Sequence, residues 1–190
     1  NPTAVGTLID GTFTLGSHPV KAVTAVEGQR LVSIEGKGMA GVPGIAARVF
    51  GVLAQADINV TMISQSSSEA SITFAVQDDE ARVAQTALNH SLSSEFARGL
   101  IEEVSISEPV GLVAAVGLGM ARQSGISGRV FATAAAQDIN VLAIAQGASE
   151  LNISFAVNQS DTRRTVIALH EEFALGQLDS GVDASTPLSN

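Results

Sequence analysis

Hydrophobic and polar positions along the chain predict short strands that alternate with short helices. The apolar run Leu31–Ile34 stops at glycines, which predicts a strand. Pro43 follows at a place where the first turn of a helix tolerates proline. Apolar residues then recur at helical spacing and predict a helix with one apolar face: Ile45, Val49, Val52, Leu53 and Ala56.

The next part of the chain predicts a hairpin, a second helix and a further strand. Val60–Ser64 and Ser71–Val76 flank a serine-rich turn, and the second of them alternates apolar with small residues, as half-buried strands do. Asp79–Leu92 places alanines and a leucine on one helical face, and Glu103–Val110 is a plausible closing strand. The predicted order is therefore β-α-β-β-α-β, the split β-α-β arrangement.

An internal repeat organises the chain. Asp57–Val60 (Asp-Ile-Asn-Val) returns as Asp138–Val141, at an offset of 81 residues (140 − 59 for the asparagines). With that offset fixed and no gaps, Gly36–Met39 aligns with Gly117–Met120. One register kept over so many positions indicates two copies of a single module.

The second copy lacks a closing strand of its own, and a sheet short of one strand would leave an edge bare. The apolar run Val20–Val26 precedes the first copy, and we expect it to complete the second sheet. The first module would then be inserted within the second. The expected divisions are residues 1–19 as the end of a preceding domain or a linker, 20–27 as the completing strand, 28–110 as the first module, 111–175 as the second module and 176–190 as a flexible tail.

Charge and composition exclude several classes of function. The net charge is −9, from 10 basic and 19 acidic residues without a basic cluster, so we expect neither nucleic acid nor an anionic membrane surface as a partner. The absence of cysteine removes disulfides, thiol catalysis and zinc–thiolate sites. Neither a signal peptide nor an apolar membrane span is present, which indicates a cytoplasmic protein. Because the chain begins at Asn1 rather than methionine, we expect a fragment or a processed chain.

The glycine-rich segment Gly36–Gly41 formally matches the dinucleotide-binding fingerprint, but its context argues against that site. In a nucleotide-binding fold the acidic residue ends the second strand, whereas Asp57 precedes it, and the second copy has Arg122 in place of the third glycine. The turn can instead bring the free N–H groups of a helix N-terminus to the carboxylate of a small ligand. A tight turn that binds nothing is the other interpretation.

Gln65 and Gln146, which the repeat aligns, end the second strand of each copy. A side-chain amide offers two donors and an acceptor, enough to hold a hydroxyl or amino group, although an exposed polar strand end is the simpler interpretation of either residue alone. Asn59 and Asn140 begin the same strands, where a turn residue is the alternative. No Ser-His-Asp arrangement or carboxylate pair typical of a catalytic centre is visible.

Five segments carry a specific family pattern: Gly36–Phe50, Ile58–Glu69, Ile72–Val76, Gly117–Met120 and Ile144–Glu150. Together they resemble the tandem ACT-domain regulatory region of aspartate kinases, over nearly the whole chain. The resemblance implies an α+β fold of two ferredoxin-like βαββαβ modules, with antiparallel sheets, helices on one face and the first module inserted in the second. It also implies that the kinase domain, with its ATP and Mg, precedes this region and is missing. This chain alone would then be no enzyme and hold no cofactor or metal.

The role implied by the resemblance is feedback inhibition, in which an end-product amino acid binds between ACT domains and shifts the kinase to an inactive state. The segment Ile63–Glu69 resembles threonine-sensitive members, including those fused to homoserine dehydrogenase. The positions carried over as effector-binding are Met39, Val42, Gly44, Ile45, Ala46, Asn59, Val60, Ile63, Gln65, Gly125, Ile126, Ser127, Asn140, Val141 and Gln146.

Two other functions stay open at this point. One is a ligand-free structural module that dimerises the kinase, and the other is a lysine-responsive sensor. Lysine-sensitive members of the resembled family tend to carry acidic or threonine residues along this strand. Thr61 is the only such residue here, which argues against lysine. We expect a homodimer formed through the ACT domains. The occupancy of one or both sites, the pairing of modules within or between chains, and the presence of a dehydrogenase domain stay open as well.

Overall fold

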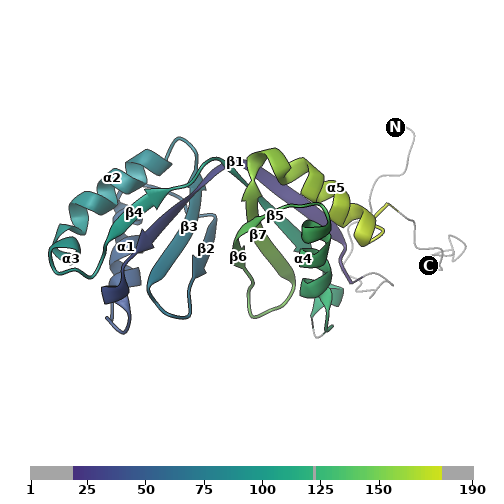
Figure 1. Ribbon diagram of the computed structural model, residues 1–190, viewed down its shortest axis with the longest axis horizontal. Helices are drawn as coiled ribbons and strands as arrows, with labels where there is room; N and C mark the ends of the chain where they lie inside the picture. The colour runs from purple at the N-terminus through teal and green to yellow at the C-terminus, as the bar shows by residue number, and fades with distance from the viewer. Residues whose placement is uncertain (1–18, 122, 177–190) are drawn as a thin grey trace, which may run out of the picture.

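The computed structural model describes residues 19–121 and 123–176 as two modules side by side, joined by one long strand (Figure 1). The strands are β1 (Ala22–Glu35), β2 (Met62–Gln65), β3 (Ser71–Gln77), β4 (Glu103–Ile106), β5 (Val110–Val116), β6 (Val141–Ala145) and β7 (Asn152–Asn158). The helices are α1 (Ile45–Gln55), α2 (Ala81–Ser91), α3 (Ser93–Ala97), α4 (Ile126–Ala136) and α5 (Thr162–Glu172). Short 3-10 turns are η1 (Lys37–Met39), η2 (Leu118–Met120) and η3 (Gln159–Asp161).

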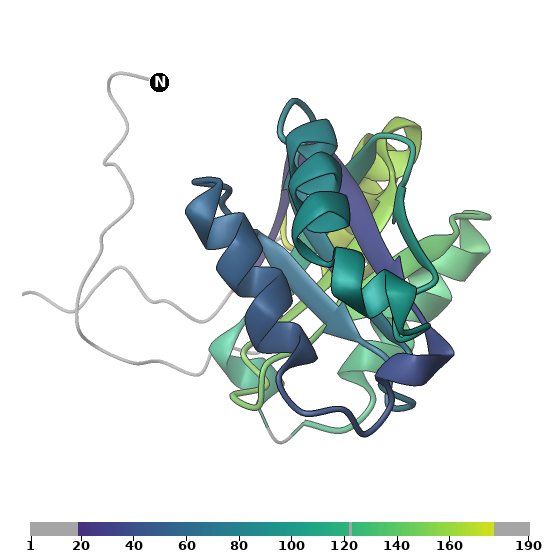
Figure 2. The ribbon, with the colours of Figure 1, turned by 90° about the vertical axis from the view of Figure 1, so that its left-hand side faces the viewer.

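All strand pairs are antiparallel and form one sheet in the order β2-β3-β1-β5-β7-β6, with β4 added on β1. The helices of each module lie on the outer side of its half of the sheet, and the inner sides face each other (Figure 1). Figure 2 shows α1 and α2 lying across the first half-sheet. The predicted α+β class, with antiparallel strands and helices on one face, is confirmed.

The long strand β1 corrects the sequence analysis, which treated Val20–Val26 and Leu31–Ile34 as two strands. They form one strand because the polar residues between them only bend it: Gly28 adopts φ +70° and the register shifts there. The first half of β1 pairs with β5, with Ala22 opposite Val116. That pairing is what insertion of the first module into the second requires, and the insertion itself, with the domain limits drawn from it, stays a prediction.

Other differences concern element limits. The strand expected at Val60–Ser64 is β2, which begins at Met62, and the expected strand Glu103–Val110 divides into β4 and the start of β5. Helix α3 was not predicted. The expected segment 1–19 and the expected tail 176–190 lie outside the described residues, apart from Pro19 and Gly176.

Each module has its own hydrophobic core beneath its helices. In the first, the predicted apolar face of α1 is buried at Ile45, Val49 and Leu53, and Phe50 meets Phe74 edge to face at 6.0 Å. The equivalent pair in the second module, Phe131 and Phe155, lies 5.7 Å apart. A third buried cluster lies between the inner sheet faces and joins the modules: Leu31, Met62, Ala75, Val110 and Ala156.

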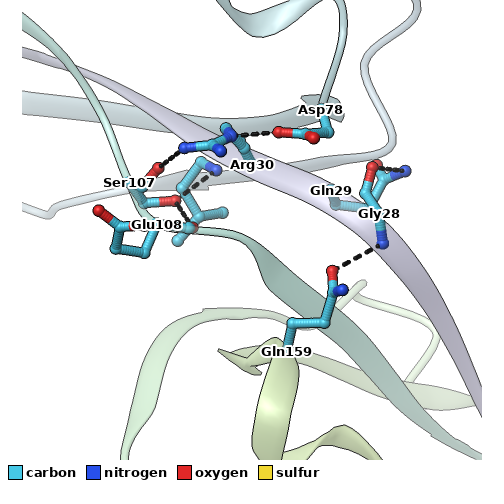
Figure 3. A network of polar contacts seen from close by, with 8 residues as sticks. Gly28, Gln29, Arg30, Asp78, Ser107, Glu108 and Gln159 are labelled. Carbon is cyan, nitrogen blue, oxygen red and sulfur yellow. Dashed lines mark hydrogen bonds and ion pairs between the residues drawn. The ribbon is translucent and has the colours of Figure 1, made fainter.

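Polar contacts brace the bend of β1 (Figure 3). The Gly28 N–H donates to Gln159 Oε1 of the second module at 3.1 Å. Arg30 forms an ion pair with Asp78 and donates through Nη1 to the Ser107 carbonyl at 2.8 Å. The Gly28–Gln159 hydrogen bond joins the two modules at the bend, and the Arg30 contacts hold the strand within the first module.

Candidate functional site

The two glycine-rich turns prepare two helix N-termini in the same way. Gly44 precedes α1 with φ +88°, and Gly125 precedes α4 with φ +90°, a left-handed conformation that glycine adopts without cost. Neither helix has a side-chain hydrogen bond at its cap. The first-turn N–H groups are therefore available to an anionic ligand group, which the helix dipole also favours.

The first pocket lies between the start of α1 and the β2–β3 hairpin, and its volume is about 340 Å³. Its walls combine the glycine-rich turn with the strand ends: Met39, Gly41, Val42, Pro43, Gly44, Ile45, Ala46, Gln65, Glu69 and Ile72. A space of this size, with few polar groups, suits a small metabolite.

The second pocket lies at the same place in the second module and has about 440 Å³. It is lined by Met120, Gln123, Ser124, Gly125, Ile126, Ser127, Gln146, Glu150 and Ile153. Gln123, Ser124 and Ser127 stand where the repeat places Val42, Pro43 and Ala46 in the first pocket. The second pocket is therefore the more polar of the two.

Ten of the fifteen predicted positions line these pockets. They are Met39, Val42, Gly44, Ile45, Ala46 and Gln65 in the first, and Gly125, Ile126, Ser127 and Gln146 in the second. The other five line neither pocket: Asn59, Val60, Ile63, Asn140 and Val141. Val60 and Gln65 are five residues apart, roughly 16 Å at the rise of a strand, so the two ends of this segment cannot contact one small ligand within a module.

Two glutamates of the pockets were missed by the sequence analysis. Glu69 and Glu150 sit in the hairpin turns with φ +56° and +55°. The N–H of Gly41 donates to Glu69 Oε2 at 2.8 Å, which ties the glycine-rich turn to the hairpin across the first pocket. The repeat marks both residues, since each follows a serine at the same offset of 81, and that recurrence was the available signal.

An ion pair between an exposed arginine and a buried glutamate holds α1 against α3. Arg48 Nε lies 2.8 Å from Glu95 Oε1, and the Glu95 side chain is 6% exposed. The Ser94 hydroxyl donates to Glu95 Oε2 at 2.6 Å, and this hydrogen bond, with the Arg48 charge, lowers the pKa of Glu95 below its usual value against the effect of burial. In the second module, Arg129 instead pairs with Glu172 at 2.7 Å and lies over the Phe173 ring.

Neither a metal site nor a membrane-spanning helix finds support in the described parts of the chain. Within residues 19–121 and 123–176, no group of three acidic or histidine side chains is placed to hold a metal ion. Over the same residues, every helix is too short or too polar to span a membrane. The pockets at the two helix starts are thus the sites to explain.

Comparison with known proteins matches both modules to one family. A family model described as "ACT domain" matches residues 32–92 and 113–173. Two curated relatives are bifunctional aspartokinase/homoserine dehydrogenases, one from the chloroplast of Arabidopsis thaliana (39% identical, covering 89% of this chain and 19% of the relative) and one from Haemophilus influenzae (37% identical, covering 90% and 21%). The chain thus spans about a fifth of the length of these relatives.

A solved structure of similar extent shows the same fold. It is the ligand-free regulatory subunit of aspartate kinase from Thermus thermophilus, which is 28% identical and superposes with a TM-score of 0.69. The likeness covers 82% of this chain and 99% of that one. The two modules of this chain therefore correspond to nearly the whole of that solved chain.

Proposed function

The chain belongs to the ACT-domain family, of which it contains two tandem copies, and from this premise we propose that it is the effector-binding region of an aspartokinase and that its effector is L-threonine. The phosphorylation of aspartate by ATP would be carried out by a kinase domain in the remainder of a longer protein. This region would report the level of the end product to that domain, in the cytoplasm. The curated relatives and the regulatory subunit from Thermus thermophilus support the aspartokinase part of this proposal.

The observation that carries the proposal is the chemistry of the first pocket, which complements an α-amino acid at three points. The uncapped start of α1 offers N–H groups to the carboxylate. Glu69 offers a carboxylate to the ammonium group, and Gln65 offers an amide to a polar side chain. Both the glutamine and the glutamate recur in the second pocket as Gln146 and Glu150.

Threonine fits the side-chain part of the first pocket better than lysine does. Val42, Ile45 and Ile72 form an apolar wall for the threonine methyl group, and Gln65 can pair with its hydroxyl. Lysine carries two ammonium groups, and Glu69 is the single acidic residue among those lining the pocket. Glu69 can pair with the α-ammonium group, so the second ammonium group of lysine would find no acidic partner in this lining.

Isothermal titration with L-threonine tests the proposal through the two glutamines. Gln65 and Gln146 are both exposed in the chain without ligand. Replacing either with alanine should weaken binding at its own pocket by about 2- to 13-fold, because a hydrogen bond of this kind contributes roughly 0.5–1.5 kcal/mol net. The variant Gln55→Ala is the matched control, since Gln55 is exposed at the end of α1 and lines neither pocket. An unchanged affinity in both pocket variants would remove these residues from the site.

We propose further that two copies of the chain associate along the edge strands β2 and β6. Ile63 and Ile144 lie exposed on these edges, at 49% and 45%. If β2 of one copy lies antiparallel to β2 of another, the start of one strand meets the end of the other, and Asn59 and Val60 reach the partner's pocket. The β2 pairing would account for Asn59, Val60 and Ile63, and an equivalent pairing of β6 with β6 would account for Asn140 and Val141.

Sedimentation of the wild-type chain and of Ile63→Lys tests the association. The wild type should sediment as a dimer, and the charged edge should give a monomer that also binds threonine more weakly. Val83→Lys is the control, because Val83 is equally exposed on α2, away from the edge. A dimer that takes up no threonine would instead favour a purely structural dimerisation module.

A further inference from the structure

Each glycine-rich turn presses against a segment of chain that crosses it, and the two crossing segments differ in origin. A Cβ on Gly38 would lie 2.8 Å from Leu100 Cα, and a Cβ on Gly119 would lie 2.9 Å from Pro19 Cα. Only glycine allows backbones to approach so closely. In the first module the crossing segment is the α3–β4 loop, whereas in the second it is the stretch by which the chain enters the fold.

The two crossings are equivalent in detail. The Lys21 N–H donates to the Val116 carbonyl at 2.8 Å, and the Glu102 N–H donates to the Glu35 carbonyl at 2.7 Å. The offset of 81 that relates the modules also relates these donors to one another, and these acceptors to one another. Residues 19–21 thus occupy, in the second module, the place that residues 100–102 occupy in the first.

Each crossing segment is packed into the core that forms one pocket. Val20 is fully buried and belongs to the same cluster as three residues that line the second pocket, which are Met120, Ile126 and Ile153. Ile101 is buried in the cluster that contributes Met39, Ile45 and Ile72 to the first pocket. A shift of either crossing segment therefore moves the apolar floor of its own pocket.

We propose that Pro19–Lys21 is the positioning segment of the second pocket, so that occupation of this pocket is coupled to the chain that precedes residue 19. The first pocket is coupled in the same way to the α3–β4 loop. The coupling is reciprocal. A ligand that orders the turn at Met120 holds Val20 in place, and a displacement of Pro19 from this turn lowers the affinity of the second pocket for its ligand. The inference rests on the proposed function in taking the pockets as ligand sites.

Hydrogen exchange on the full chain without ligand tests the coupling through matched glycine variants. In Gly119→Ala, the amides of residues 21–26 should exchange about tenfold faster, while those of residues 102–106 stay unchanged. In Gly38→Ala the pattern should reverse. Met120→Ala and Met39→Ala provide the same comparison from the pocket side, should an added Cβ prevent folding. Equal effects of the paired variants on both segments, or no effect on either, would overturn the proposal.

A second arm adds L-threonine as the probe. Threonine should slow exchange at residues 21–26 in the wild type and in Gln65→Ala, but not in Gln146→Ala. Protection that survives in Gln146→Ala, or that is lost in Gln65→Ala, would refute the assignment of this segment to the second pocket. A chain that binds no threonine in calorimetry refutes the proposed function. Hydrogen exchange of Gly119→Ala and Gly38→Ala without ligand would still test the coupling in that case.

Discussion

Glu95 is the residue whose burial has the clearest energetic consequence. Its carboxylate is almost fully enclosed, yet it carries a charge that Arg48 and the Ser94 hydroxyl satisfy. A buried carboxylate with these partners favours the ionised form, which explains why its pKa is lowered. The pair fixes α1, and with it the helix start that forms the first pocket.

Glu95→Gln should destabilise the chain at pH 7 by roughly 1.5–3 kcal/mol, the usual value of hydrogen bonds to a charged group. Because the folded pKa of Glu95 lies below the unfolded value, its contribution is present above about pH 4.5 and is lost as the pH falls through the folded pKa. Urea unfolding at a series of pH values measures the difference between the variant and the wild type. That difference should shrink below pH 4.5, and a constant difference would contradict the assigned charge.

Glu172→Gln is the matched control for that series. Glu172 pairs with Arg129 at the equivalent helix, but its side chain is 37% exposed. Exposed pairs contribute little, about 0–1 kcal/mol, since water screens them. The control should therefore change stability less than Glu95→Gln at neutral pH.

At the residue scale, the sequence identified the glutamines of the pockets but not the glutamates. Gln65 is the last residue of β2 and Gln146 directly follows β6, and both strands have an apolar pattern, so the place of each glutamine could be predicted. Glu69 reaches the first pocket because its backbone is left-handed in a serine-rich turn, and it is anchored by the N–H of Gly41. The left-handed conformation of Glu69 and its hydrogen bond to Gly41, which lies 28 residues earlier, produce no pattern of hydrophobic positions in the sequence. Hydrophobic patterning therefore could not reveal this site residue.

At the scale of elements, β1 is the feature that the hydrophobic pattern could not show whole. The polar stretch around Gly28 divides one strand into two apparent runs, although pairing with different neighbours on each side keeps it continuous. The repeat held a usable sign, because Val20–Ala25 aligns with Ile101–Ile106 at the same offset. Helix α3 was missed for a simpler reason, since five residues are too few to show helical periodicity.

Two glycine substitutions should act in opposite directions on the elements that contain them. Gly28→Ala should destabilise by about 1–2 kcal/mol, because the bend of β1 needs φ +70° and an L-residue is strained there. Gly51→Ala should stabilise by roughly 0.5–1 kcal/mol, because Gly51 lies inside α1 with open space for a Cβ. Thermal unfolding measures both, and changes of the same sign would contradict the role of the bend.

At the scale of the whole molecule, the sheet order places both edges, β2 and β6, next to the pockets. The five predicted positions outside the pockets lie on or just before these edge strands. Asn59, Asn140 and Ile63 are exposed, whereas Val60 and Val141 are partly buried against the module cores. Within its own module none of them lines the pocket, so their role in binding depends on the proposed association of two chains. The resemblance to a known family, rather than any hydrophobic pattern, is what suggested both these positions and the dimer.

The two modules differ most in how their pockets connect to the rest of the chain. Their cores, aromatic pairs and turns repeat. The glycine-rich turn of the first pocket, however, packs against the α3–β4 loop, and that of the second packs against Pro19. Because one pocket packs beside an internal loop and the other beside residues 19–21, binding of the same effector at the two pockets can have different consequences. The proposed function therefore concerns two sites that are alike in chemistry and unlike in connection.

The most direct test of effector binding is thermal unfolding of the full chain with L-threonine or L-lysine, each at about 100 times the dissociation constant found by titration, or at the highest soluble concentration where none is found. Threonine should stabilise the wild type by roughly 2.7 kcal/mol for each site filled, and lysine should not. The double variant Gln65→Ala, Gln146→Ala should lose the stabilisation. No shift with threonine, or an equal shift with lysine, would contradict the assignment of this chain as a threonine-binding region.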